Sequence, residues 1–115
     1  MARYAYTHIE WDEDFGGYIM LESTDPQVID MFHIQVKQLV PNCQLAAWIP
    51  WPGGDCQPTG DPTGEAWWAR ADKVWKGDRV HAEALGFWIV KQLCLEGWEP
   101  FNVSRRSFCL RKRLE

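Results

Sequence analysis

The chain has none of the motifs that would name a reaction or a membrane anchor. No stretch of its 115 residues approaches the roughly 18 consecutive apolar residues that span a bilayer. The N-terminal Met1-Ala2-Arg3-Tyr4 also lacks the apolar segment of a secretory signal peptide. These absences predict a cytoplasmic protein.

Serine is scarce, and no serine stands in the setting of a hydrolase nucleophile. It occurs only at positions 23, 104 and 107, and none of the three lies in a G-x-S-x-G pattern. Hydrolytic chemistry by serine therefore has no support from a motif.

Residues that bind metal ions are present, but not at the spacings that metal sites need. His81-Ala82-Glu83 matches the start of a zinc deaminase site, which also needs a later P-C-x-x-C that the chain lacks. We interpret this segment as an ordinary first turn of a helix. A second candidate metal site is the acidic run 10–14 beside His8, but this run lacks the spacing of an EF-hand. It is interpreted as a solvated acidic turn, with a weak divalent-cation site as the alternative. We expect no metal and no cofactor.

The four cysteines, at positions 43, 56, 94 and 109, form no C-x-x-C pair. Cys94 and Cys109 lie within apolar helix and strand patterns, which favours buried, reduced thiols over a disulfide or a metal site. Cys56 lies among glycine and proline residues and is expected to be exposed.

The most unusual feature of the composition is the high number of tryptophan residues. The chain has eight, is 46% hydrophobic and 24% charged, and carries a net charge of −4. This composition is typical of a soluble globular protein, and the length suits one domain, expected over residues 1–113. Leu114-Glu115 is interpreted as a cloning-site remnant.

The first half of the chain predicts a hairpin, a helix and a strand. Aromatic and β-branched residues over 4–9 and 18–21 indicate two strands around the acidic turn. Asp25-Pro26 supplies an N-cap and a proline at the first helical position, and Pro41 ends the helix. A third strand is expected over 43–49. The apolar face of this helix comprises Val28, Ile29, Phe32, Val36, Leu39 and Val40.

The second half repeats strands and a helix after an irregular stretch that ends near residue 64. A short strand is expected over 65–71 and a second helix over 80–95, with Asp78 as its cap. This helix is apolar on almost every side, so it is either deeply buried or contacts a partner as well as the sheet. Gly97 suits the left-handed position after the helix, and 101–103 and 108–110 alternate as half-buried strands.

This order of elements predicts a single α+β domain with a mostly antiparallel sheet of five or six strands packed against two helices. The expected core contains Phe32, Leu39, Leu85, Ile89, Leu93 and Phe108, since each lies on the inward period of its element.

The C-terminal quarter resembles a family of small uncharacterised bacterial domains. The resemblance rests on a helix followed by Glu96-Gly97-Trp98-Glu99 and a closing strand that ends in basic residues. Where the family has an aliphatic residue, this chain has Pro100, and the central proline- and glycine-rich loop has no counterpart in the family. The resemblance implies the same fold and no established activity.

Two surfaces are candidates for binding. The first surrounds the irregular loop and consists of Trp48, Trp51, Trp67 and Trp68 with Asp55 and Asp61. Rigid aromatic rings beside prolines suit a platform for a sugar, a base, a proline-rich peptide or another subunit. The alternative is that these rings fold back as a roof over the core.

The second candidate is a basic cluster of Arg105, Arg106, Arg111, Lys112 and Arg113. Removing its five positive charges from a chain of net charge −4 leaves −9 on the remainder, so charge is segregated. A phosphate-bearing partner suits this cluster, but the acidic remainder would repel a long polyanion, which makes nucleic acid an unlikely partner. A solvated strand edge whose cations discourage further pairing is the alternative.

We predict a small noncatalytic binding or protein-interaction module, with an unknown protein, a small ligand or a second copy of the chain as its partner. Two other functions stay open. One is a small enzyme that uses Asp55, Asp61 or Glu65 in a pocket of the loop, and the other is a nucleic-acid adaptor that uses the basic hairpin.

Overall fold

The computed structural model describes residues 3–13, 17–45, 49–52, 65–72, 74 and 81–114; for residues 45, 49–52, 65–68 and 81 it describes the backbone alone. The elements follow one another along the chain as two strands, a helix, three strands, a helix and two strands. They are β1 (Tyr4–Asp12), β2 (Tyr18–Ser23), α1 (Pro26–Leu39), β3 (Gln44–Leu45), β4 (Ile49–Pro52), β5 (Glu65–Asp72), α2 (His81–Leu95), β6 (Glu99–Ser104) and β7 (Ser107–Arg113).

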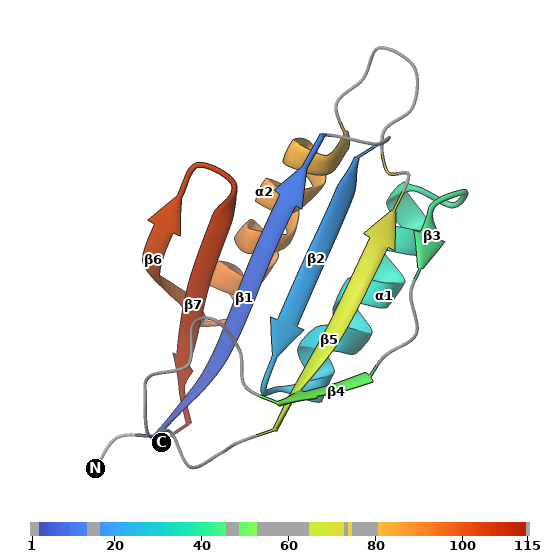
Figure 1. Cartoon of the computed structure of the whole chain (residues 1–115). Coiled ribbons are helices and arrows are strands. Elements are labelled where there is room, and N and C mark those ends of the chain that lie inside the picture. The colour runs from blue at the N-terminus through green and yellow to red at the C-terminus, as the bar shows by residue number, and fades with distance from the viewer. Residues whose placement is uncertain are drawn as a thin grey trace.

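The described strands form one antiparallel sheet in the order β3-β5-β2-β1-β7-β6 (Figure 1). The first and last strands of the chain are neighbours in it, because β1 pairs with β7 from Tyr4↔Arg113 to Glu10↔Ser107. The Leu114 N–H extends this pairing by donating to the Arg3 carbonyl at 2.9 Å.

The outer edge of β5 is shared by two short strands. β3 pairs with its end at Asp72, and β4 pairs with its beginning, from Ile49↔Trp68 to Pro52↔Glu65. The single strand expected over 43–49 is therefore two strands. The predicted α+β class is confirmed, with five longer strands and these two short ones.

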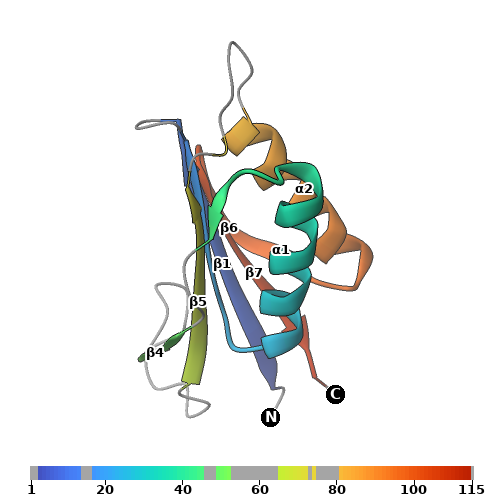
Figure 2. The same cartoon turned by 90° about the vertical axis from the view of Figure 1, so that its right-hand side faces the viewer.

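Both helices lie on the same face of the sheet, and no helix covers the other face in the described part of the chain (Figure 2). Along β1, alternate residues point to the two faces. Ala5, Thr7, Ile9 and Trp11 are buried beneath the helices. Tyr4, Tyr6, His8, Glu10 and Asp12 point to the face without helices, which we call the open face.

The helix α1 begins and ends as its sequence predicts. The Asp25 carboxylate accepts a hydrogen bond from the Gln27 N–H at 2.9 Å, and Pro26 occupies the first turn. Val28, Ile29, Phe32 and Val36 are buried against the sheet. Because burial of each such side chain contributes about 1.5–3 kcal/mol, this face holds the helix in place.

The C-terminal end of α2 closes in a Schellman motif. The Trp98 N–H donates to the Leu93 carbonyl at 3.0 Å and the Gly97 N–H to the Cys94 carbonyl at 3.1 Å. Gly97 has φ +96°, a backbone conformation that favours glycine, as its place in the sequence predicts.

The predicted core is correct for Phe32, Leu85, Ile89 and Leu93, which are all buried, while Phe108 is partly buried against them. Leu39 is wrong, since it is the last residue of α1 and 54% of its surface is exposed. It lies at the end of α1, beyond Val36, which is the last buried residue of that helix.

The expectation that β6 is half-buried is also wrong. Every residue of β6 is exposed, including Phe101 and Val103. β6 is the outermost strand, and α2 packs chiefly over β1 and β2, so little covers β6 from the helical side.

The cysteines differ from the prediction at two positions. Cys94 is exposed on α2, and Cys109 is buried on β7 but forms a disulfide. Cys43 is buried and free, as expected of a core thiol. Burial raises the pKa of the Cys43 thiol, and the nearby Lys37 ammonium partly opposes that effect.

Candidate functional site

The predicted tryptophan surface falls largely outside the described residues. Trp48, Asp55 and Asp61 lie there entirely, and only the backbones of Trp51, Trp67 and Trp68 are described. Trp51 in β4 pairs with Ala66, and the adjacent Trp67 and Trp68 in β5 pair with Pro50 and Ile49. The strand pairing thus brings three of the four tryptophan backbones to one corner of the sheet.

The basic cluster is divided over several parts of the β6–β7 hairpin. Arg105 is exposed in the turn, while Arg106 Nη1 lies 3.3 Å from Asp12 Oδ2. Register with β1 places Arg111 and Arg113 on the open face and Lys112 on the helical face. The five cations therefore do not form one continuous patch.

Arg111 belongs to a small aromatic group instead. Its guanidinium lies 4.9 Å from the ring centroid of Tyr4 and 5.7 Å from that of Phe101, and its Nε is 3.4 Å from Glu99 Oε1. The guanidinium of Arg111 already interacts with two rings and a carboxylate of the same chain. Its attraction for a phosphate group of a partner is therefore weaker than that of an unpaired arginine.

The His81-Ala82-Glu83 segment begins α2, with Ala82 buried and Glu83 exposed. The Glu83 N–H donates to Glu13 Oε1 at 3.0 Å, so a carboxylate that follows β1 satisfies a free N–H at the helix start. Asp78, the expected cap, lies outside the described residues. Within the part of the chain that the structure describes, no three His, Cys, Asp or Glu side chains form a group that could hold a metal ion.

The outer surface of the helical layer is more apolar than that of an ordinary amphipathic helix. On α2, the exposed fractions are 47% for Phe87, 42% for Trp88 and 72% for Leu95. Trp88 Nε1 donates to Gln35 Oε1 of α1 at 2.7 Å, which holds the ring between the two helices. Beside it is a cavity of about 260 Å³ lined by Leu39, Val40, Ala84, Leu85 and Trp88.

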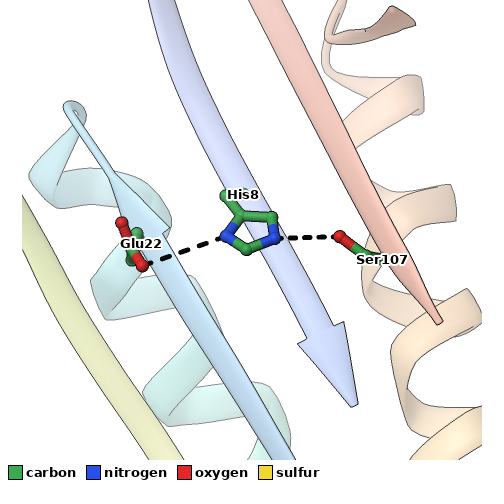
Figure 3. Close-up of polar contacts among 3 residues, drawn as sticks. All are labelled: His8, Glu22 and Ser107. Carbon is green, nitrogen blue, oxygen red and sulfur yellow. Dashed lines mark hydrogen bonds and ion pairs between the residues drawn. The ribbon is translucent and has the colours of Figure 1, made fainter. Parts of the chain in front are cut away.

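The open face carries a row of three polar side chains from three adjacent strands (Figure 3). They are Glu22 of β2, His8 of β1 and Ser107 of β7. His8 is directly opposite Glu22 in the register, and Ser107 is opposite Glu10, two residues further along β1. Side chains at these positions share one face, which brings the three groups together.

The row has the order of a nucleophile, a base and a carboxylate, with a hydrogen bond at the first contact and an ion-pair distance at the second. His8 Nε2 is 2.9 Å from Ser107 Oγ, and His8 Nδ1 is 3.9 Å from Glu22 Oε1. His8 is 7% exposed and Glu22 5%, whereas Ser107 is half-buried. Among the described residues, Glu22 Oε2 is buried with no hydrogen-bond partner. Burial of a carboxylate oxygen without a hydrogen bond is energetically unfavourable unless a positive charge lies nearby. Such a group in a folded protein therefore points to a functional role.

Sequence reasoning missed this row. It considered His8 only as a possible metal ligand beside the acidic run, and it set Ser107 aside because no hydrolase motif surrounds it. The expected strand over 4–9 does contain His8, but β1 continues through Glu10 to Asp12, which the sequence assigned to the acidic run. The available signal was a polar histidine within a segment of aromatic and β-branched residues, which is unusual for a strand that is not exposed.

Comparisons with known proteins identify no relative, since no protein-family model, no curated protein and no solved structure matches the chain. The resemblance of the C-terminal quarter to a bacterial domain family thus has neither support nor contradiction from them.

Proposed function

We propose that this protein is a small binding and interaction module that associates with a second copy of itself through the outer face of α2. The observation that carries the proposal is the exposure of Phe87, Trp88 and Leu95 on one helix. The sequence left two explanations for an α2 that is apolar on nearly every side, namely deep burial or contact with a partner. The exposure of these side chains excludes deep burial and favours a partner.

A second copy suits this surface for two reasons. Lys91 is the one charged residue between Trp88 and Leu95, so two α2 helices that pack together bring few charges into contact. The cavity beside Trp88 also accepts a protruding apolar side chain, and the same surface supplies one in Leu95. A helix of 15 residues presents this surface over a length of about 22 Å.

Sedimentation velocity over a range of concentrations tests this association. We expect a dimer that Leu95→Lys or Trp88→Ala dissociates, since aromatic and apolar anchors of an interface commonly contribute 2 kcal/mol or more, in order of magnitude. The matched control is Val103→Lys, which changes an exposed apolar residue on β6. Because Cys94 is exposed on α2, a thiol cross-linker should also join two chains there. A protein that stays monomeric at every concentration tested would refute the proposed self-association.

The loop surface of Trp48, Trp51, Trp67 and Trp68 with Asp55 and Asp61 stays part of the proposed module, for a protein or a small ligand. It predicts that Trp51→Ala weakens an association without lowering the melting temperature. If Trp51→Ala instead mainly lowers the melting temperature, the tryptophans are a roof over the core and the surface does not bind.

The location of the protein is a separate question, for which the sequence predicts the cytoplasm. No helix in the described part of the chain is long and apolar enough to cross a membrane. The disulfide at Cys109 is of a kind that is rare in the cytosol of mesophiles, so it argues for an oxidising compartment. Fractionation of the cells that produce the protein decides between the two.

A further inference from the structure

We propose that Ser107 is a nucleophile that His8 activates, so that the open face of the sheet can accept an acyl group from an ester. This activity goes beyond the proposed association, which uses the opposite, helical side of the molecule. The contact that carries it joins Ser107 Oγ and His8 Nε2 at 2.9 Å, the distance of a hydrogen bond between a nucleophile and its general base (Figure 3).

The strands hold the three groups rigidly, which an acyl-transfer site requires. His8 lies on β1, the strand between β2 and β7, and the pairings on both sides run along most of its length. Glu22 Oε1 lies within ion-pair distance of His8 Nδ1. Glu22 is a positioning residue in this arrangement, because its charge favours the tautomer that carries the proton on Nδ1, in which the lone pair of Nε2 can accept the proton of Ser107.

The step balances without any further reactant except water. Ser107 Oγ forms a bond to the carbonyl carbon of the ester, and its proton passes to His8 Nε2. The bond from that carbon to the leaving oxygen breaks, and His8 gives the proton to the leaving group. Water then attacks the acyl-Ser107 ester, loses a proton to His8, and Ser107 recovers its hydroxyl.

The charges around Ser107 restrict the substrate class. Glu10 stands opposite Ser107, and Glu22 and Asp12 lie on the same face of β2 and β1. Arg106 is the nearby cation, and it lies 3.3 Å from Asp12. Among the described residues of this part of the face, the carboxylates of Glu10, Asp12 and Glu22 outnumber the guanidinium of Arg106. This disfavours an anionic acyl donor, so the expected substrates are uncharged or cationic esters. Cys109, opposite His8, is in a disulfide and therefore offers no competing thiol.

The decisive experiment treats the native protein with p-nitrophenyl acetate, an uncharged activated ester, and maps the acetyl group by peptide mass spectrometry. We expect a burst of about one p-nitrophenolate per chain and an acetyl group on Ser107. Acetylation of lysines alone, or of no residue, would overturn the proposal. Because this result comes from the unaltered chain, it does not depend on whether any variant folds.

Matched variants separate the roles of the residues. Ser107→Ala should abolish the burst, while Ser104→Ala, its cross-strand neighbour, should leave it unchanged. His8→Gln should slow acylation by about 100-fold or more, the usual contribution of a general base, whereas His33→Gln, on an exposed face of α1, should not. Equal bursts in Ser107→Ala and the unaltered protein would also refute the assignment.

The pH dependence tests Glu22. The acylation rate should fall in acid as His8 becomes protonated, with Glu22, Glu10 and Asp12 favouring its charged form and Arg106 opposing it. Removal of one carboxylate charge by Glu22→Gln should move the fall to lower pH. A profile that does not move would show that Glu22 has only a structural role and would remove it from the proposal.

Discussion

Gly86 of α2 lies directly against the indole of Trp11 on β1. A Cβ atom at this position would overlap Trp11 Cε3 and would stand 2.6 Å from Cδ2, closer than any real contact. Trp11 is itself enclosed, since it stacks on Phe108 at 5.7 Å between ring centroids and meets Phe87 at 5.2 Å. The glycine thus allows α2 to approach the sheet closely at this point.

Gly86→Ala should therefore destabilise the fold, although alanine favours helices more than glycine. The indole has little room to move, so we expect a loss of about 1–3 kcal/mol in the free energy of unfolding, as in other overpacked cores. Urea denaturation measures it. Lys91→Ala, at an exposed site of the same helix, is the control and should change stability by less than about 0.5 kcal/mol. A Gly86→Ala variant more stable than the parent would contradict the close packing.

The exposure of Leu39 predicts that its truncation lowers the free energy of unfolding much less than truncation of a buried leucine or isoleucine. Leu93→Ala or Ile89→Ala should cost about 2–5 kcal/mol, because each leaves a cavity in the core. Leu39→Ala should cost well under half of that, since most of its side chain already contacts water. Similar losses at Leu39 and Leu93 would restore the original prediction that both are core residues.

A count of free thiols tests the oxidation state of the cysteines directly. Cys43 and Cys94 are free, and Cys109 is in a disulfide. Titration of the unfolded, unreduced protein should find two thiols, and a non-reduced digest should contain one peptide pair joined through Cys109. Four thiols would support the reduced state that the sequence favoured.

The two free thiols should differ in reactivity at neutral pH. Burial raises the pKa of Cys43, so less of it is the reactive thiolate, and the side chain is also covered. Alkylation by iodoacetamide should modify Cys94 first, and the rate at Cys43 should increase as the pH rises towards its pKa. Faster modification of Cys43 than of Cys94 would be inconsistent with this environment.

Local patterns were enough to place most helices and strands. Asp25-Pro26 and the apolar spacing from Val28 to Val36 predicted α1, because capping and helical periodicity depend on residues at most four positions apart. Gly97 was recognisable for the same reason, since the Schellman motif that needs it closes within one turn. The α+β class followed from the order of these elements.

Contacts between distant residues depended on the tertiary structure. His8 and Ser107 are 99 positions apart, and only the pairing of the first strand with the last brings them together. A shift of that register by one residue would turn Ser107 to the opposite face, and no local pattern specifies the register. The exposure of Leu39 and β6 likewise depends on where α1 ends and which strands α2 covers, and these follow from the packing of whole elements on the sheet.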